Sequence, residues 1–151
     1  MQTILCVTNR RRKALNGIHN RQLAPDSAIE CDYEGEDPRA QVMLLWPGLA
    51  LQAAATDRQH QLKKNALRHT IESVDAQHCK LVRENGETLT VPTLDVAKLF
   101  RLVHAITYDS SQARTLYGGI RLTELENPHF SLRRLIVGLG RSPTGALVQL
   151  E

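Results

Sequence analysis

The first 25 residues constrain the fold more than any other part of the chain. Residues 2–7 form a short apolar run rich in branched side chains, which predicts a buried β-strand. Thr8 or Asn9 follows directly and can cap a helix, along which apolar residues recur at helical spacing as far as Leu23. A strand that leads straight into a helix is a βα unit, and βα units build parallel sheets. We therefore expect an α/β fold.

The middle of the chain has a different pattern, with short alternating runs separated by turn residues. The runs over residues 79–83 and 88–91 flank Asn85-Gly86, and Asn-Gly is the strongest short hairpin signal because both residues tolerate the positive φ of a type I′ turn. We interpret residues 41–92 as a small antiparallel β module, whose size and strand number suit an SH3-like barrel. The acidic stretch at residues 30–37 is expected to form a loop before it.

After residue 93 the pattern returns to that of an α/β protein. We predict, in order, a strand over residues 100–107, a short helix over 109–114, a strand within 117–125, a helix from 131 to about 140, and a closing strand over 146–150. These elements and the N-terminal βα unit would share one sheet. The predicted architecture is an α/β domain of residues 1–40 and 93–151, interrupted by the β module at 41–92.

Composition places the chain among globular proteins, with 42% hydrophobic and 23% charged residues. The net charge is only +3, but the charge is segregated, with basic clusters at residues 9–13, 63–64 and 133–134 and one acidic stretch. Such segregation can create a local positive groove, whereas any single cluster is better interpreted as a solvated face. Three widely spaced cysteines without a CxxC argue against a disulfide framework or a structural zinc site. With no signal peptide and no bilayer-length apolar run, an intracellular location is expected.

A cluster of polar residues follows the strand predicted at residues 100–107. The cluster comprises Thr107, Ser110, Ser111 and Gln112. Hydroxyls, an amide side chain and free backbone N–H groups at the start of a helix suit a nucleic-acid phosphate. The alternative interpretation is an ordinary serine-rich helix cap.

Four segments, in this order, resemble the C-terminal motor region of superfamily 1 helicases, in the branch that includes RecD-like and viral enzymes. They are residues 4–9 with Asn16, residues 45–71, residues 105–116 (similar to helicase motif V) and residues 135–142 (similar to motif VI). The resemblance implies a second RecA-like domain that carries an inserted SH3-like module. It covers nearly the whole chain, and motifs V and VI together are more specific than either alone.

The resemblance also implies roles for individual residues. Arg141 of motif VI would act as an arginine finger that reaches the γ-phosphate of ATP held on another RecA-like domain. The alternative is a surface arginine that stabilises a helix end. Residues implied to approach the nucleotide are Arg10, Arg11, Arg12 and Gln112. Residues implied to contact single-stranded nucleic acid are Lys63, Lys64 and Asn65, together with the motif V cluster. Trp46 is interpreted as a core or module-interface residue rather than a base-stacking one.

The sequence contains no G-x-x-x-x-G-K-[ST] motif and no convincing paired acidic site for magnesium. ATP and Mg²⁺ would therefore require a separate P-loop-bearing domain. The leading hypothesis is half of a helicase motor that acts on single-stranded nucleic acid, with DNA favoured over RNA. A second is a catalytically inactive stand-alone binding module, which Asp109, Ala113 and Gly140 favour because they depart from the family pattern. A third is a pure interaction protein that keeps only the fold.

Overall fold

The computed structural model describes residues 3–64, 68–111, 120–128 and 148–150. Contacts divide the chain into two compact units. Unit 1 comprises residues 1–16 and 104–151, and unit 2 comprises residues 17–103. The predicted domain boundaries, with an α/β domain of residues 1–40 and 93–151 and a β module of residues 41–92, stay a prediction.

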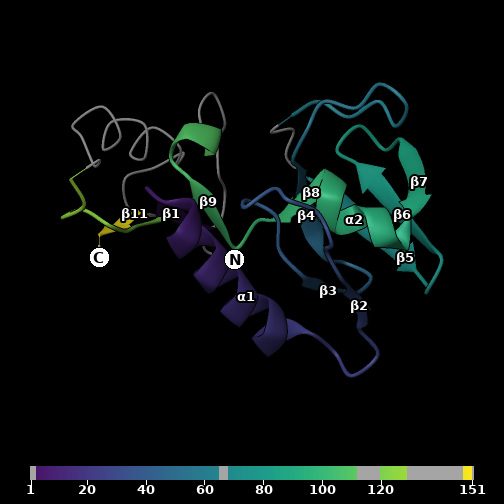
Figure 1. The fold of residues 1–151 in the computed structure, drawn as a ribbon, viewed down its shortest axis with the longest axis horizontal. Coiled ribbons are helices and arrows are strands. Elements are labelled where there is room, and N and C mark those ends of the chain that lie inside the picture. Colours follow the sequence, from purple (N-terminus) through teal and green to yellow (C-terminus); the bar gives the residue numbers. More distant parts are fainter. Residues whose placement is uncertain (1–2, 65–67, 112–119, 129–147, 151) are drawn as a thin grey trace. The chain divides into compact units, whose positions relative to one another are not determined.

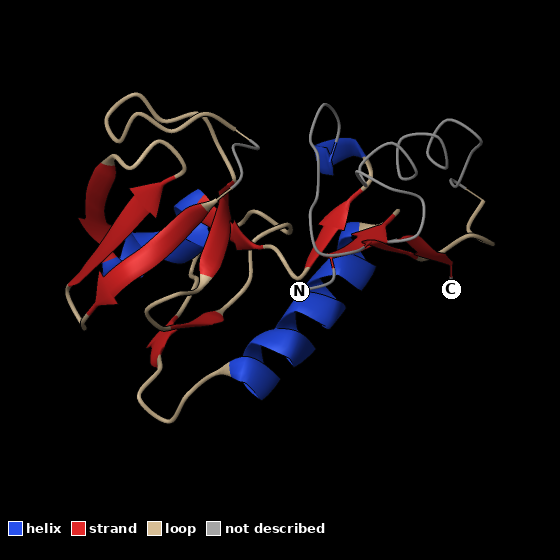
Figure 2. Cartoon of the chain, turned by 180° about the vertical axis from the view of Figure 1, so that it is seen from behind, coloured by secondary structure: helices blue, strands red, loops and turns tan. Residues whose placement is uncertain are grey.

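Unit 1 contains a parallel sheet (Figures 1 and 2). Its four strands are β1 (Thr3–Cys6), β9 (Ala105–Thr107), β10 (Ile120–Leu122) and β11 (Val148–Leu150). Their order is β11-β10-β1-β9, and every neighbouring pair is parallel. Strand β1 leads into α1 (Asn9–Leu23), and Leu15 of this helix packs against a core of Ile4, Cys6 and Ala105. The predicted βα unit and the shared parallel sheet are confirmed.

Unit 2 is built from antiparallel strands. Strands β2 (Ile29–Cys31) and β3 (Met43–Leu45) form a two-stranded sheet. A five-stranded sheet has the order β7-β6-β5-β4-β8 and comprises β4 (Ala50–Ala53), β5 (His69–Val74), β6 (His78–Arg83), β7 (Thr88–Pro92) and β8 (Phe100–Leu102). The 3-10 helix η1 (Thr93–Asp95) and α2 (Val96–Leu99) connect β7 to β8. Trp46 packs against the apolar core of this unit, as the sequence indicated.

The hairpin at Asn85-Gly86 is confirmed, but its predicted turn type is wrong. Gly86 has a φ of +85°, whereas Asn85 is not among the residues with positive φ. The Gly86 N–H donates to the Arg83 carbonyl (2.9 Å), and the Arg83 N–H donates to the Glu87 carbonyl (2.8 Å). This is the pattern of a type I turn followed by a left-handed glycine, in which only one residue requires positive φ.

Two strand predictions also need correction. Residues 100–107 form two strands, not one, because β8 pairs with β4 in the antiparallel sheet and β9 pairs with β1 in the parallel sheet. The acidic stretch at residues 30–37 was expected to form a loop, but its first two residues belong to β2. Cys31 faces the core and Glu30 faces solvent, and this alternation is typical of a strand with one buried face. The strand predicted at residues 146–150 is confirmed by β11. The helix predicted from residue 131 lies outside the described residues.

Two asparagines of α1 pair with strand backbones through their side-chain amides. The Asn16 amide donates to the Ala105 carbonyl (2.8 Å) and accepts from the Ala105 N–H (2.7 Å). Asn20 makes the same pair of hydrogen bonds with Leu44 of β3, at 3.0 and 2.8 Å. Each side-chain amide therefore supplies the hydrogen bonds that a neighbouring strand would give to Ala105 of β9 or to Leu44 of β3. In the described part of the chain, no helix is long and apolar enough to cross a membrane.

We predict that Asn16→Ala lowers the free energy of unfolding by about 2–4 kcal/mol, because it leaves the fully buried Ala105 N–H and C=O without these partners. Urea unfolding followed by circular dichroism measures the loss. Gln22→Ala, an amide on the exposed face of the same helix, is the control and should change stability by less than about 0.5 kcal/mol. Equal effects of the two substitutions would contradict this role of Asn16.

Candidate functional site

The carboxyl ends of the parallel strands bring three loops to one edge of the unit 1 sheet. Register pairs place Cys6 beside Thr107 and Leu5 beside Leu122. From β1 the chain continues to β9, which is the neighbour of β1 on one side. It then crosses to β10, the neighbour of β1 on the other side, and continues outward to β11. The strand order therefore reverses between β1 and β10. In open α/β sheets, ligands bind beyond the carboxyl ends of the strands at such a switch point.

The turn after β9 contains the first part of the predicted phosphate-binding cluster. Thr107 Oγ1 accepts a hydrogen bond from the Ser110 N–H (3.2 Å) and donates one to Ser110 Oγ (3.0 Å). Ser110 Oγ in turn donates to the Thr107 carbonyl (3.2 Å). The expected strand-to-helix turn is present, with a 3-10 helix over Asp109–Ser111, and its two hydroxyls are bonded to each other.

Two buried side chains that sequence reasoning missed hold this edge together. The Tyr108 hydroxyl donates to the Thr123 carbonyl (3.0 Å), and the Thr123 hydroxyl donates to the Leu5 carbonyl (2.8 Å). Each of the two residues is only 1% exposed. The neighbouring Cys6 is fully buried, and burial raises the pKa of its thiol to about 11. Cys6 therefore packs in the core as a protonated thiol, together with Ile4 and Ala105.

Glu124 occupies the switch point between β1 and β10. One carboxylate oxygen accepts hydrogen bonds from the backbone N–H groups of Val7 (2.5 Å) and Thr8 (2.9 Å). The other accepts from the Thr8 hydroxyl (2.9 Å), which itself accepts from the Arg11 N–H (3.2 Å). Thr8 therefore caps α1, and it is one of the two residues, Thr8 and Asn9, that were predicted for this role. Glu124 has a φ of 58°, a left-handed conformation that non-glycine residues seldom adopt.

This carboxylate lies next to the start of α1, where negative charge is favourable. Helix N-termini attract negative charge, but the first turn of α1 contains no acidic residue. It contains instead the three arginines that the sequence assigned to nucleotide contact. Arg10 and Arg11 are exposed, whereas Arg12 is 5% exposed and its Nε donates to Asn9 Oδ1 (3.1 Å). Arg12 therefore contributes to the structure of the helix start, and Arg10 and Arg11 are accessible.

The lysine pair belongs to unit 2, on a structured loop. Asp57 and Leu62 form an isolated β-bridge with backbone hydrogen bonds of 2.9 and 2.7 Å, and the Leu62 side chain is buried in the core. The Lys64 N–H donates to Thr56 Oγ1 (3.2 Å). Lys63 and Lys64 are both exposed, and neither ammonium group has an ion pair within the described residues. The loop thus presents two charges from an ordered backbone.

The remaining predicted site residues lie outside the described part of the chain. They are Asn65, Gln112 and Arg141, and nothing is described of the Ser111 side chain. Within the described residues, no group of three histidine, cysteine, aspartate or glutamate side chains is arranged to hold a metal ion.

Comparison with known proteins gives matches in structure only. No protein-family model matches the chain, and no curated protein matches its sequence. A structure of two coordinating Pif1 helicases at forked double-stranded DNA matches with a TM-score of 0.73 and 15% identity, over 99% of this chain and 38% of that one. Bacteroides Pif1 bound to single-stranded DNA matches with a TM-score of 0.72 and 16% identity (99% and 40%). Pif1 helicase from Candida albicans matches with a TM-score of 0.65 and 14% identity (99% and 44%).

This chain shares the fold of about two fifths of these Pif1 chains. At such low identity the likeness establishes the fold alone, and it confirms the predicted RecA-like parallel sheet interrupted by a small antiparallel module. The chain spans about two fifths of the length of these Pif1 chains. The narrower RecD-like or viral type and the SH3-like character of the module stay predictions.

We predict that Glu124→Ala lowers the free energy of unfolding by about 2–3 kcal/mol, because three hydrogen bonds to a charged group and the counter-charge at the start of α1 are lost. Chemical denaturation measures the change. Glu126→Ala, an exposed glutamate in the same loop, is the control and should be nearly neutral. If Glu124→Ala leaves the chain as stable as the control does, the carboxylate is dispensable at the switch point.

Proposed function

We propose that this chain is the C-terminal half of a superfamily 1 helicase motor, which binds single-stranded nucleic acid and completes an ATPase with a separate P-loop-bearing domain. One observation carries the proposal. The carboxyl edge of a parallel sheet brings the turn at Thr107–Ser110 beside the start of α1, within a fold that Pif1 structures match over 99% of the chain. One of those structures holds single-stranded DNA, and another holds ADP-AlF3 with single-stranded DNA.

The nucleic-acid site is proposed to include Thr107, Ser110, Ser111 and Gln112. The Ser110 hydroxyl donates to the Thr107 carbonyl. Rotation of the Ser110 hydroxyl hydrogen about the Cβ–Oγ bond would redirect this donor to a phosphate oxygen without a change in the backbone turn. Such contacts read the phosphate backbone and not the bases, so we expect binding that tolerates any sequence.

A second group of residues, in unit 2, is also proposed to contact nucleic acid. Lys63 and Lys64, with Asn65, are proposed to contact the strand from a loop that is anchored by Leu62. We assign this loop to an inserted SH3-like module of residues 41–92, and residues 1–40 and 93–151 to the RecA-like domain. DNA is favoured over RNA as the ligand, since the Pif1 structures hold DNA.

Arg141 is proposed as the arginine finger toward ATP bound on the P-loop domain. Of the arginines at the start of α1, Arg10 and Arg11 are exposed and are proposed to approach the nucleotide. Arg12, which is buried, would keep this helix start in place, and Gln112 would lie near the nucleotide as well. ATP and Mg²⁺ would be held by the partner domain, because this sequence lacks the P-loop motif.

A second candidate function is a stand-alone module that binds single-stranded nucleic acid without catalysis. It is favoured by Asp109, whose exposed carboxylate lies in the turn proposed to contact phosphate. Repulsion there would impair the coupling of ATP turnover to movement along a nucleic-acid strand, whereas Lys63 and Lys64 would still bind the strand. The two functions differ on Arg141, which matters for ATP turnover only in the first.

Binding to oligo-thymidine should weaken steeply with salt, because each lysine–phosphate contact releases a counterion. Fluorescence anisotropy at several salt concentrations measures the slope of log K against log salt. Lys63→Ala/Lys64→Ala should weaken binding and reduce the slope by about 1.4, which corresponds to two single-strand contacts. The control is Lys80→Ala/Lys98→Ala, which removes two exposed lysines elsewhere in unit 2. Binding that is insensitive to salt, or equal losses in both double variants, would contradict the assigned loop.

The isolated chain should not hydrolyse ATP, with or without single-stranded DNA, since it has no phosphate cradle. When the cognate P-loop domain is supplied, Arg141→Ala should reduce ATP turnover by about 10³-fold or more. DNA affinity of the same variant should remain unchanged. Turnover by the isolated chain would overturn the half-motor proposal, whereas a neutral Arg141→Ala in the reconstituted pair would favour the stand-alone binding module.

A further inference from the structure

The two-stranded sheet of unit 2 has one closed edge and one open edge. In β3, the N–H and C=O of Leu44 both bond to the side-chain amide of Asn20. In an antiparallel pair, both groups of one residue point to the same side, and opposite residues alternate between bonded and non-bonded pairs. Since Leu44 lies opposite Glu30, the backbone N–H and C=O of Glu30 must point away from β3. Asn20 therefore closes the β3 edge, and β2 has no equivalent partner among the described residues.

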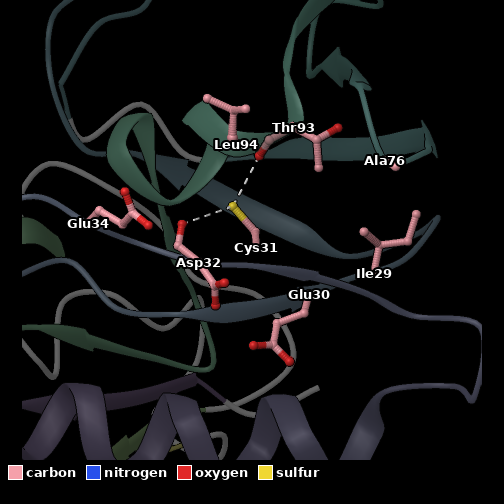
Figure 3. A pocket seen from close by; sticks show the side chains of 8 residues that line it. All are labelled: Ile29, Glu30, Cys31, Asp32, Glu34, Ala76, Thr93 and Leu94. Atoms are coloured by element: carbon pink, nitrogen blue, oxygen red, sulfur yellow. Dashed lines mark hydrogen bonds between the residues drawn. The ribbon is translucent and has the colours of Figure 1, made fainter.

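A groove runs along this open edge. A cavity of about 450 Å³ is lined by four consecutive residues of the chain, Ile29 to Asp32, and by Ala76, Thr93 and Leu94, with Glu34 at one end (Figure 3). A second cavity of about 480 Å³ shares Asp32, Glu34 and Leu94 with the first. Together they extend the groove past the end of β2. Leu94 is 76% exposed, which leaves an apolar side chain in solvent at the place where the two cavities meet.

The groove is pre-formed by hydrogen bonds on the side opposite β2. Thr93 Oγ1 donates to the Asp75 carbonyl (2.8 Å), and the Thr93 N–H donates to the Gln77 carbonyl (3.0 Å). The Cys31 thiol lies 3.1 Å from the Thr93 carbonyl, as a donor. Burial raises the pKa of this thiol, which keeps the proton in place for that bond. The width of the groove is thus set before any ligand arrives.

We propose that the β2 edge binds an extended basic peptide of another protein as an added strand. Backbone groups of Glu30 would pair with the peptide, which is the mode of β-strand addition. The carboxylates along the two cavities are Glu30, Asp32, Glu34 and Glu36, and the one basic residue that lines them is Lys98. Charge complementarity therefore selects a peptide rich in lysine or arginine. Alternate positions of the peptide would be apolar, to contact Ile29 and Leu94.

Charge also argues against the other occupants of such an edge. A second copy of this chain, paired edge to edge, would bring Glu30 and Asp32 close to the same carboxylates of its partner, and like charges across a strand pair are unfavourable. A nucleic acid would be repelled by the same groups. The remaining alternative is that the acidic residues only protect an exposed edge from association, in which case no peptide binds.

The probe is a synthetic acetylated and amidated peptide of alternating lysine and valine, six residues long, titrated into the full ¹⁵N-labelled chain. We expect amide shifts at Ile29–Asp32 and at Leu94, and affinity that falls at least tenfold in Glu30→Lys/Asp32→Lys. The control Glu84→Lys/Glu87→Lys reverses two exposed charges at the β6–β7 turn and should bind as the native chain does. Both variants replace exposed side chains, and their amide spectra verify folding.

A peptide N-methylated at alternate residues separates strand addition from simple charge attraction. Methylation removes the backbone donors that a strand needs and keeps the charge, so this peptide should not bind. The proposal is overturned if the methylated peptide binds equally well, if charge reversal at Glu30 and Asp32 has no effect, or if no amide near β2 shifts. Dimerisation of the chain through residues 29–32 would also overturn it, in favour of a second copy.

Discussion

Unit 1 depends on the position of β1 between β9 and β10. These partners lie about one hundred residues later in the sequence, since Ile4 pairs with Ala105 on one side and with Arg121 on the other. Closing so long a connection has an entropic cost that the buried pairing must offset. The parallel arrangement then forces the carboxyl ends of all three strands to a single edge. Thr8, Thr107 and Glu124 are brought together by this one constraint.

The polar groups at this edge are paired with one another. Glu124 supplies the negative charge at the start of α1, and the hydroxyls of Thr107 and Ser110 satisfy each other. These polar groups therefore have partners within the chain, which avoids the penalty of unsatisfied donors.

Local patterns predicted the elements whose cause is local. The strand over residues 2–7 with its cap at Thr8, and the hairpin at Asn85-Gly86, depend on neighbouring residues, and both are present. The split of residues 100–107 between two sheets was missed because an apolar run contains no mark of the partner strand. Glu124 was missed because its hydrogen bonds span more than one hundred residues and depend on a left-handed backbone. Thr107 and Ser110 lie where the sequence indicated, while their role stays a proposal.

The most direct test of the proposed function is a map of backbone amide shifts on addition of oligo-thymidine to the full ¹⁵N-labelled chain. If the proposed function is correct, this titration should shift the amides of Tyr108–Ser111 and the amides of Lys63 and Lys64. The amides of the β6–β7 turn should stay unchanged. If the chain is saturated with oligo-thymidine and the amides of Tyr108–Ser111 do not shift, the assignment of the sheet edge as the nucleic-acid site is contradicted.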